Sequence, residues 1–218
     1  MTPSHKVSAA PRLFVLSPKQ KRMLRFTALG LVLIAGGVGV YVYMANAPQR
    51  AQAQFDLAMK QMKPGNYKTA IEGFDKAIEI WSGLADAYLE RGNAYHNLGD
   101  DEHAIADFEK AADLNPALYR AYAAIGSIYR ERKDYRRAMD AYTKSIQAKP
   151  NVDAFFERGQ TYEALGEHQK AVEDYDKAIQ EMPDAPAVYR ARSLARRNLG
   201  DEAGYAADRD EAYRIEHR

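Results

Sequence analysis

The sequence predicts an all-α protein in which an N-terminal transmembrane helix is followed by an α-solenoid of about five helix pairs. Three observations carry this prediction. Residues 26–45 are uncharged and mostly apolar, residues 51–218 repeat with a period of 33 or 34 residues, and each repeat places small and aromatic residues in one fixed register. Cysteine is absent from the 218 residues, so the fold depends neither on disulfides nor on thiolate metal sites.

The first 25 residues form a basic segment that we expect in the cytoplasm. They contain no Asp or Glu, and their cations are Lys6, Arg12, Lys19, Lys21, Arg22 and Arg25. Lys and Arg are concentrated on the cytoplasmic side of membrane helices. The rest of the chain is therefore expected on the other side of the membrane.

Residues 26–45 have the length and composition of a membrane span. A helix of twenty residues is roughly 30 Å long, which matches the hydrocarbon core of a bilayer. Tyr41 and Tyr43 lie near its second end, where amphipathic rings favour the headgroup region. We expect a single-pass protein of the bacterial inner membrane, with a cytoplasmic N-terminus and a periplasmic body. Ala35 and Gly39 form a small-xxx-small pair that permits a homo-oligomer.

A cleaved signal peptide is the alternative interpretation of this segment. Ala45-Asn46-Ala47 has the small-x-small pattern of a cleavage site. The long basic segment, the length of the apolar run and Pro48 after the cut favour an uncleaved signal anchor instead. Residues 46–50 are then a short linker.

The remaining chain repeats, and one small residue in each repeat defines the register. Successive small residues are 34, 34, 33 and 34 positions apart, at Ala58, Gly92, Gly126, Gly159 and Ser193. An aromatic residue follows sixteen positions later in the first four repeats, as Phe74, Phe108, Tyr142 and Tyr175. This register predicts units of about 51–84, 85–118, 119–151, 152–185 and 186–218.

Each unit is expected to contain two amphipathic helices joined by a short polar turn. The turns are Pro64-Gly65-Asn66, Gly99-Asp100, Lys133-Asp134, Gly166-Glu167 and Gly200-Asp201. A small residue such as Gly92 lets the two helices approach closely, and Phe108 fills the space between them. Pro116, Pro150 and Pro183 end the second helices of three units. No unit can bury its apolar face alone, so the units must stack.

This register resembles that of the tetratricopeptide (TPR) repeat family, in which Gly, Tyr, Ala, aromatic, Ala and Pro occur at these offsets. The likeness extends from Ala51 to about His217. Its departures are confined to the two end units, and they are Gln61, Ser82, Arg196, Tyr205 and Arg209. End units of a solenoid face water on one side and are expected to be atypical. The resemblance implies a right-handed solenoid with a concave groove that binds proteins.

The resemblance also implies which positions line that groove, because the first helix of each unit lines it in the family. The partner-binding positions implied for this chain are Phe55, Met59, Leu89, Asn93, Arg120, Ser127, Phe156, Gln160, Arg190 and Leu194. The apolar members are expected to be anchors for an extended or helical polypeptide segment, since a few desolvated side chains carry most binding energy. The alternative for each of them is that it contacts the next unit or is simply exposed to solvent.

The chain offers no sign of catalysis, of a cofactor or of a metal. The HExxH, GxxxxGK[ST] and GxSxG patterns are absent. The carboxylate clamp of chaperone-binding TPR modules is also absent, because Phe55/Met59 or Leu89/Asn93 stand where its Lys/Asn pair should begin. Residues 50–218 hold 25 cations against 30 acids, so nucleic acid is not an expected partner.

The sequence therefore predicts a non-enzymatic scaffold or adaptor, anchored in the membrane, that holds a polypeptide during envelope assembly, secretion or cytochrome maturation. Three alternatives stay open: a structural subunit that self-associates, a secreted soluble repeat protein after signal cleavage, and an accessory factor that positions an enzyme's substrate.

Overall fold

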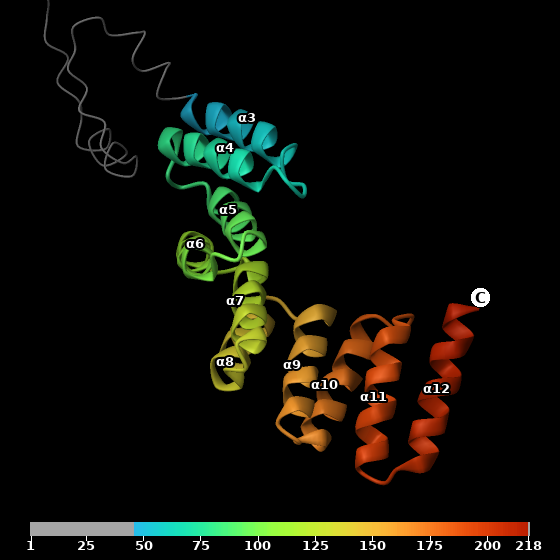
Figure 1. The fold of residues 1–218 in the computed structure, drawn as a ribbon. Coiled ribbons are helices and arrows are strands. Elements are labelled where there is room, and N and C mark those ends of the chain that lie inside the picture. The colour runs from blue at the N-terminus through green and yellow to red at the C-terminus, as the bar shows by residue number, and fades with distance from the viewer. Residues whose placement is uncertain (1–45, 218) are drawn as a thin grey trace, which may run out of the picture. The chain divides into compact units, whose positions relative to one another are not determined.

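The computed structural model describes residues 46–217, which form one domain built from helices (Figure 1). The basic segment 1–25 and the transmembrane prediction for residues 26–45 lie outside the described residues. Within residues 46–217 no helix combines the length and apolarity needed to cross a bilayer.

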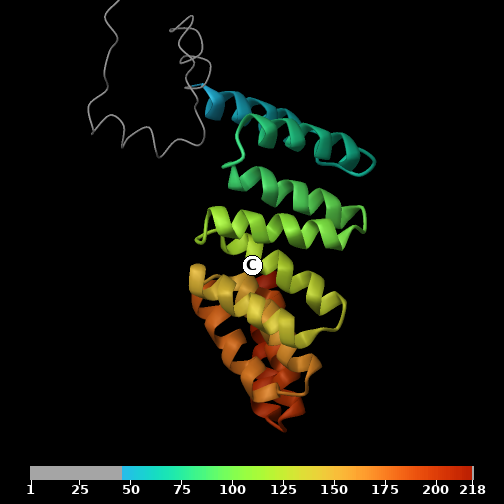
Figure 2. The same cartoon turned by 90° about the vertical axis from the view of Figure 1, so that its left-hand side faces the viewer.

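The helices pair in the order of the chain, and each pair is one repeat unit. Their bounds are α3 (Ala47–Met59) and α4 (Tyr67–Ile80), α5 (Ala85–Asn97) and α6 (Asp101–Leu114), α7 (Tyr119–Glu131) and α8 (Tyr135–Ala148), α9 (Val152–Ala164) and α10 (His168–Glu181), and α11 (Pro186–Asn198) and α12 (Glu202–Glu216). The second helix of each unit also packs against the first helix of the next, so the five units stack into a continuous solenoid (Figures 1 and 2).

The linker predicted at residues 46–50 is mostly helical. Helix α3 begins at Ala47, so four of those five residues form its first turn. Pro48 is compatible with this position, because the first-turn N–H groups of a helix have no intrahelical partner and proline lacks that group.

Each predicted turn lies between the two helices of its unit, and one residue in each turn has the left-handed backbone conformation. Gly65, Gly99, Gly166 and Gly200 have positive φ angles, and Lys133 takes this conformation in the third unit with φ 59°. Asp100, Asp134 and Asp201 then cap the second helices by accepting hydrogen bonds from backbone N–H groups.

The small residue of each central unit lies against the aromatic residue sixteen positions later. A Cβ atom built on Gly126 would lie 2.6 Å from Cε1 of Tyr142, and Tyr142 is completely buried. Gly92 and Gly159 are equally close to Phe108 and Tyr175. The predicted role of these positions is confirmed: glycine is required because the ring occupies the volume that a side chain would need.

Arginine–aspartate pairs with a buried aspartate join the helices of three units. In unit 4, Nε of Arg158 donates to Asp174 at 2.7 Å and the adjacent guanidinium nitrogen donates to the same carboxylate at 2.8 Å. The corresponding pairs are Arg91–Asp107 in unit 2 and Arg192–Asp208 in unit 5.

The same arginines also connect one unit to the one before it. Arg91 and Arg192 each donate at 2.5 Å to an aspartate of the preceding second helix, Asp75 and Asp176. Arg158 donates to Thr143 at 3.0 Å. In unit 3 the corresponding residues are Ile125 and Ala141, both buried in the apolar core. The arginine and the aspartate are thus either both present or both replaced in units 2 to 5.

Candidate functional site: the concave groove

The first helices of the units line the inner side of the solenoid. Helix α5 contacts α7, α7 contacts α9 and α9 contacts α11. No comparable contact joins successive second helices within residues 46–217. The stack therefore curves toward the first helices, and their exposed faces form the concave groove, as the TPR resemblance implied.

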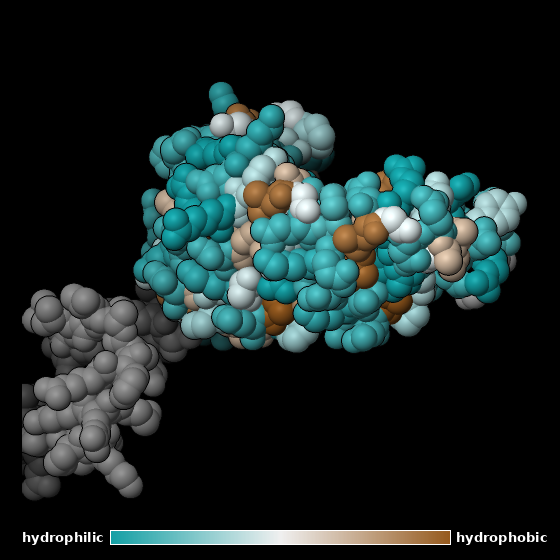
Figure 3. Space-filling view, turned by 90° about the horizontal axis from the view of Figure 1, so that it is seen from below, coloured by the Kyte–Doolittle hydropathy of each residue, from teal (hydrophilic) through white to brown (hydrophobic). Residues whose placement is uncertain are grey.

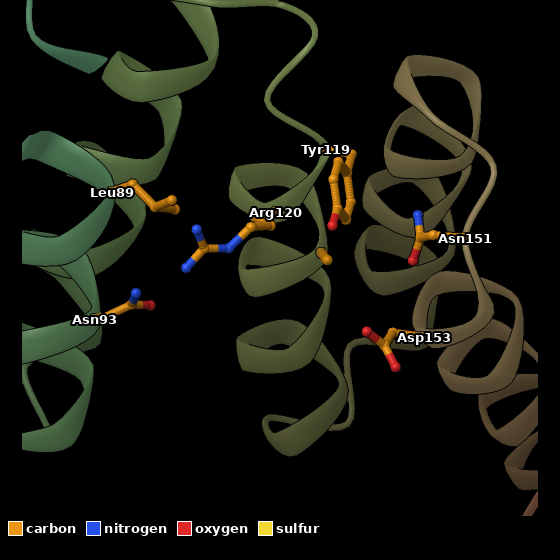
Figure 4. Close-up of a pocket in the computed structure, with 7 residues that line it drawn as sticks. Leu89, Asn93, Tyr119, Arg120, Asn151 and Asp153 are labelled. Atoms are coloured by element: carbon orange, nitrogen blue, oxygen red, sulfur yellow. The ribbon is translucent and has the colours of Figure 1, made fainter. Parts of the chain in front are cut away.

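The groove is hollowed at its centre, between α5, α7 and the start of α9. The hollow has a volume of about 270 Å³ and is lined by Leu89, Asn93, Tyr119, Arg120, Ala123, Asn151 and Asp153. Leu89 and Asn93 come from α5, and the Arg120 side chain extends toward them from α7 (Figure 4). Asp153 and Asn151 approach from the other side (Figure 4). An apolar floor is thus surrounded by amide groups and by charges of both signs.

A buried carboxylate connects the first two helices of this hollow. Glu90 of α5 is only 8% exposed. It accepts a hydrogen bond from Nδ2 of Asn93 at 2.9 Å and one from Arg120 of the next unit, also at 2.9 Å. Since a buried carboxylate needs such partners, Glu90 fixes the positions of both Asn93 and Arg120 at the edge of the hollow.

A second ion pair crosses the next junction, from α7 to α9. A guanidinium nitrogen of Arg130 lies 2.7 Å from Oε2 of Glu157. Burial raises the pKa of the Glu157 carboxyl above its ordinary value, and Arg130 opposes this effect. The hydroxyl of Tyr142, which is 3.3 Å from Oγ of Ser127, lies in the same cluster. The groove floor on this side of the hollow is therefore polar, and the charges of Arg130 and Glu157 offset one another.

Leu89, predicted as an apolar anchor of the groove, is a core residue rather than an exposed side chain. Leu89 is 1% exposed and belongs to the core cluster of Phe108, Ile125 and Ile128. It forms the floor of the hollow, where little of its surface is available to a partner. Its burial follows from the close contact between α5 and α7, since a leucine on the inner face of α5 is covered by the next unit.

Phe55 and Phe156 are half-buried, so they contribute to packing as well as to the groove. The ring of Phe55 lies 5.6 Å from that of Phe74, and the ring of Phe156 lies 5.9 Å from that of Tyr175. Each therefore covers the core aromatic residue of its own unit.

Leu194 and Met59 are the exposed apolar members of the predicted set, at 46% and 38%. They lie in the end units, on α11 and α3, and the structure does not bring them into the central hollow. Arg190 is exposed and pairs with Glu216, whereas Ser127 and Gln160 are half-buried on α7 and α9. Of the ten predicted positions, Leu89, Asn93 and Arg120 line the hollow.

The TPR resemblance also implies that Glu90 and Asp153 line the groove, on the first helices of units 2 and 4. Sequence reasoning missed that Glu90 is buried and that it pairs with Asn93 and Arg120. Glu90 immediately follows Leu89. Its position in the repeat is expected to face solvent, so a charged residue there gave no sign that it would be buried. The Arg–Asp pairs were missed as well, although their signal was present: an Asp occurs sixteen residues after the arginine in each of units 2, 4 and 5.

Apolar residues are scattered elsewhere on the surface. On the face seen in Figure 3, hydrophobic patches are separated by hydrophilic side chains. Isolated exposed leucines are ordinary on protein surfaces, whereas binding sites are marked by contiguous apolar areas. This face therefore offers no rival to the groove.

Family models and solved structures agree on the type of protein. Models described as "Tetratricopeptide repeat" match residues 85–118 and 125–196. No curated protein matches the chain by sequence.

Several solved structures are similar to this chain over most of its length. A crystal structure of MamA is 25% identical, covers 73% of this chain and 94% of its own, and has a TM-score of 0.66. Residues 41 to the end of MamA from Desulfovibrio magneticus RS-1 are 19% identical, with coverages of 77% and 96% and a TM-score of 0.66. PilF of Pseudomonas aeruginosa is 17% identical over 78% of both chains, with a TM-score of 0.71. At these lower identities the likeness establishes the fold alone.

The stacked helix pairs, the glycine–aromatic contacts within them and the matches to the family models lead to one conclusion: this chain is a member of the tetratricopeptide repeat family.

Proposed function

We propose that the protein is a non-enzymatic scaffold that holds a segment of a partner polypeptide in the hollow between α5, α7 and α9. The TPR fold supports the general role of a protein-interaction scaffold. The observation that carries the more specific proposal is the hollow itself, with its apolar floor at Leu89 and Ala123 and with Arg120 and Asp153 on opposite sides.

The chemistry of the hollow suits a polypeptide segment. Its volume is about 270 Å³, at the lower limit of the roughly 300–1,000 Å³ of small-molecule pockets. One N–H of the Asn93 side-chain amide donates to Glu90. The other N–H and the side-chain oxygen Oδ1 are left for the backbone of a bound segment. Arg120 and Asp153 can orient that segment by its charges.

We expect Ala123→Trp to block this site without unfolding the protein. Ala123 lines the hollow and is only half-buried, so an indole can occupy the space that the partner would fill. The recovery of crosslinked partner from native membranes should fall at least tenfold, which corresponds to about 1.4 kcal/mol, while the melting temperature stays unchanged. Ala206→Trp on the exposed face of α12 is the matched control and should have no effect. Equal recovery for the two variants would reject the hollow as the binding site.

The location of the protein is part of the proposal. The uncharged run at residues 26–45 and the six cations before it support a signal anchor in a bacterial inner membrane, with the repeat domain in the periplasm. Envelope assembly, secretion and cytochrome maturation are the processes in which such a scaffold would hold a polypeptide.

Reporter fusions test this topology. Alkaline phosphatase fused after Arg218 is expected to be active, and a fluorescent protein that matures only in the cytoplasm is expected to be dark at the same position. The opposite pair of results would place the repeat domain in the cytoplasm. Release of the protein from membranes by carbonate would instead support cleavage near Ala47.

A further inference from the structure

We propose that Trp81 lies in the headgroup layer of the membrane. The first helix pair then contacts the lipid surface through the end at which α3 begins. This inference depends on the membrane anchoring proposed above. The occupant of the surface around Trp81 is thus a lipid bilayer rather than another protein.

Trp81 and the start of α3 lie at the same end of the first unit. Ala51 of α3 and Ala77 of α4 belong to one core cluster, and the two helices are antiparallel. Ala47 is one turn before Ala51, and Trp81 is one turn after Ala77, whose carbonyl oxygen accepts a hydrogen bond from the Trp81 backbone at 3.0 Å. Figures 1 and 2 both place the beginning of α3 next to the connection from α4 to α5.

The sequence leaves almost no distance between the uncharged run and this end. Only Asn46 separates Ala45, the last residue of the run, from Ala47, the first residue of α3. Two Cα–Cα steps span at most about 8 Å, and the headgroup region is roughly 5–8 Å thick on each side of a bilayer. If residues 26–45 cross the membrane, the first turn of α3 must therefore lie in or against the headgroups.

Trp81 has the exposure and chemistry that suit this layer. It is the only tryptophan of the chain, and its side chain is 40% exposed at the end of α4. The indole lies over Gly83, where a built Cβ would be 3.0 Å from Nε1. No hydrogen bond from Nε1 to an acceptor occurs within residues 46–217. An apolar ring with a free N–H is favoured at the membrane–water interface.

The repeat does not require an aromatic residue at this position. Asn115, Lys149 and Met182 occupy the same place, at the ends of α6, α8 and α10. Tryptophan is thus a feature of the unit nearest the uncharged run. Glu79 is exposed close to Trp81. Its negative charge does not attract anionic lipids, so the contact does not depend on them. Zwitterionic lipid should be sufficient.

The single tryptophan makes a direct test possible. The full chain is inserted into phosphatidylcholine vesicles whose acyl chains are brominated near the headgroup or near the bilayer centre. Emission of Trp81 is expected to be quenched by the shallow bromine and much less by the deep one. Met59→Trp in a Trp81→Phe background is the matched control, because Met59 is 38% exposed and ends α3, about 18 Å along the helix from Ala47. The control should not be quenched.

The outcomes separate this inference from the anchoring on which it depends. If carbonate strips the full chain from the vesicles, both the anchoring and the lipid contact are wrong. If the chain resists carbonate but Trp81 is no more quenched than the control, the anchoring stands and the lipid contact is overturned. Equal quenching of both tryptophans would mean that the domain does not rest on the bilayer by this end, and it would also overturn the inference.

Discussion

Replacing Arg158 with isoleucine is expected to lower the free energy of unfolding by about 3–5 kcal/mol, because it leaves a buried charge without its partner. The side chain of Asp174 is only 3% exposed and accepts two hydrogen bonds from Arg158. These hydrogen bonds raise the pKa of the Arg158 guanidinium above its ordinary value. Lys177 is 3.6 Å from Asp174 but half exposed, so we expect it to compensate only weakly. Urea titration followed by circular dichroism measures the loss.

The chain itself supplies the control for this variant. Unit 3 carries Ile125 and Ala141 at the positions of Arg158 and Asp174, and both are buried. The double variant Arg158→Ile/Asp174→Ala copies that solution into unit 4 and should recover most of the lost stability. If the double variant is as unstable as the single one, the buried charge is not the cause, and our account of the unit junctions is wrong.

Truncating Leu89 to alanine should cost about 2–5 kcal/mol, the usual range for a leucine in a packed core. Leu89 is 1% exposed between α5 and α7 and forms the floor of the hollow. The same truncation at Leu194, which is 46% exposed on α11, should change stability by less than about 0.5 kcal/mol. Both variants are compared by chemical denaturation.

This comparison separates a core role from a binding role. The isolated protein has no partner bound, so a loss of stability in Leu89→Ala must come from lost packing in the core and not from lost contact with a partner. If Leu89→Ala leaves stability unchanged, Leu89 is not a core residue, and its position in the structure is contradicted.

The repeat could be predicted from the sequence because its signals are local and recur. Glycines recur after 33 or 34 residues, and an aromatic residue follows each of them sixteen positions later. This pattern specifies a close helix pair wherever it occurs. Gly126 and Tyr142 meet as this register predicts. The start of α3 was less predictable, because Asn46 and Pro48 are typical both of a linker and of a helix N-terminus.

The groove was predictable in location but not in detail. The residues that line the groove depend on the distance between successive first helices. That distance cannot be predicted from the sequence of a single unit. The resemblance therefore implies a groove anchor at Leu89, whereas most of its side chain is buried in the core between α5 and α7. Glu90 shows the converse: a charged residue is buried because Arg120, thirty positions later, reaches it from the next unit.

The central claim is that the hollow between α5, α7 and α9 holds a polypeptide segment, and site-specific crosslinking in native membranes tests it most directly. A photoreactive amino acid is placed at Ala123, in the hollow, or at Ala206, on the outer face of α12. We predict a discrete crosslinked product from position 123 that is absent from position 206 and is lost when Arg120→Glu reverses the charge at the edge of the hollow. A product with twice the mass of the chain would identify a second copy as the bound polypeptide. The same products from both positions, or none from position 123, would contradict the account.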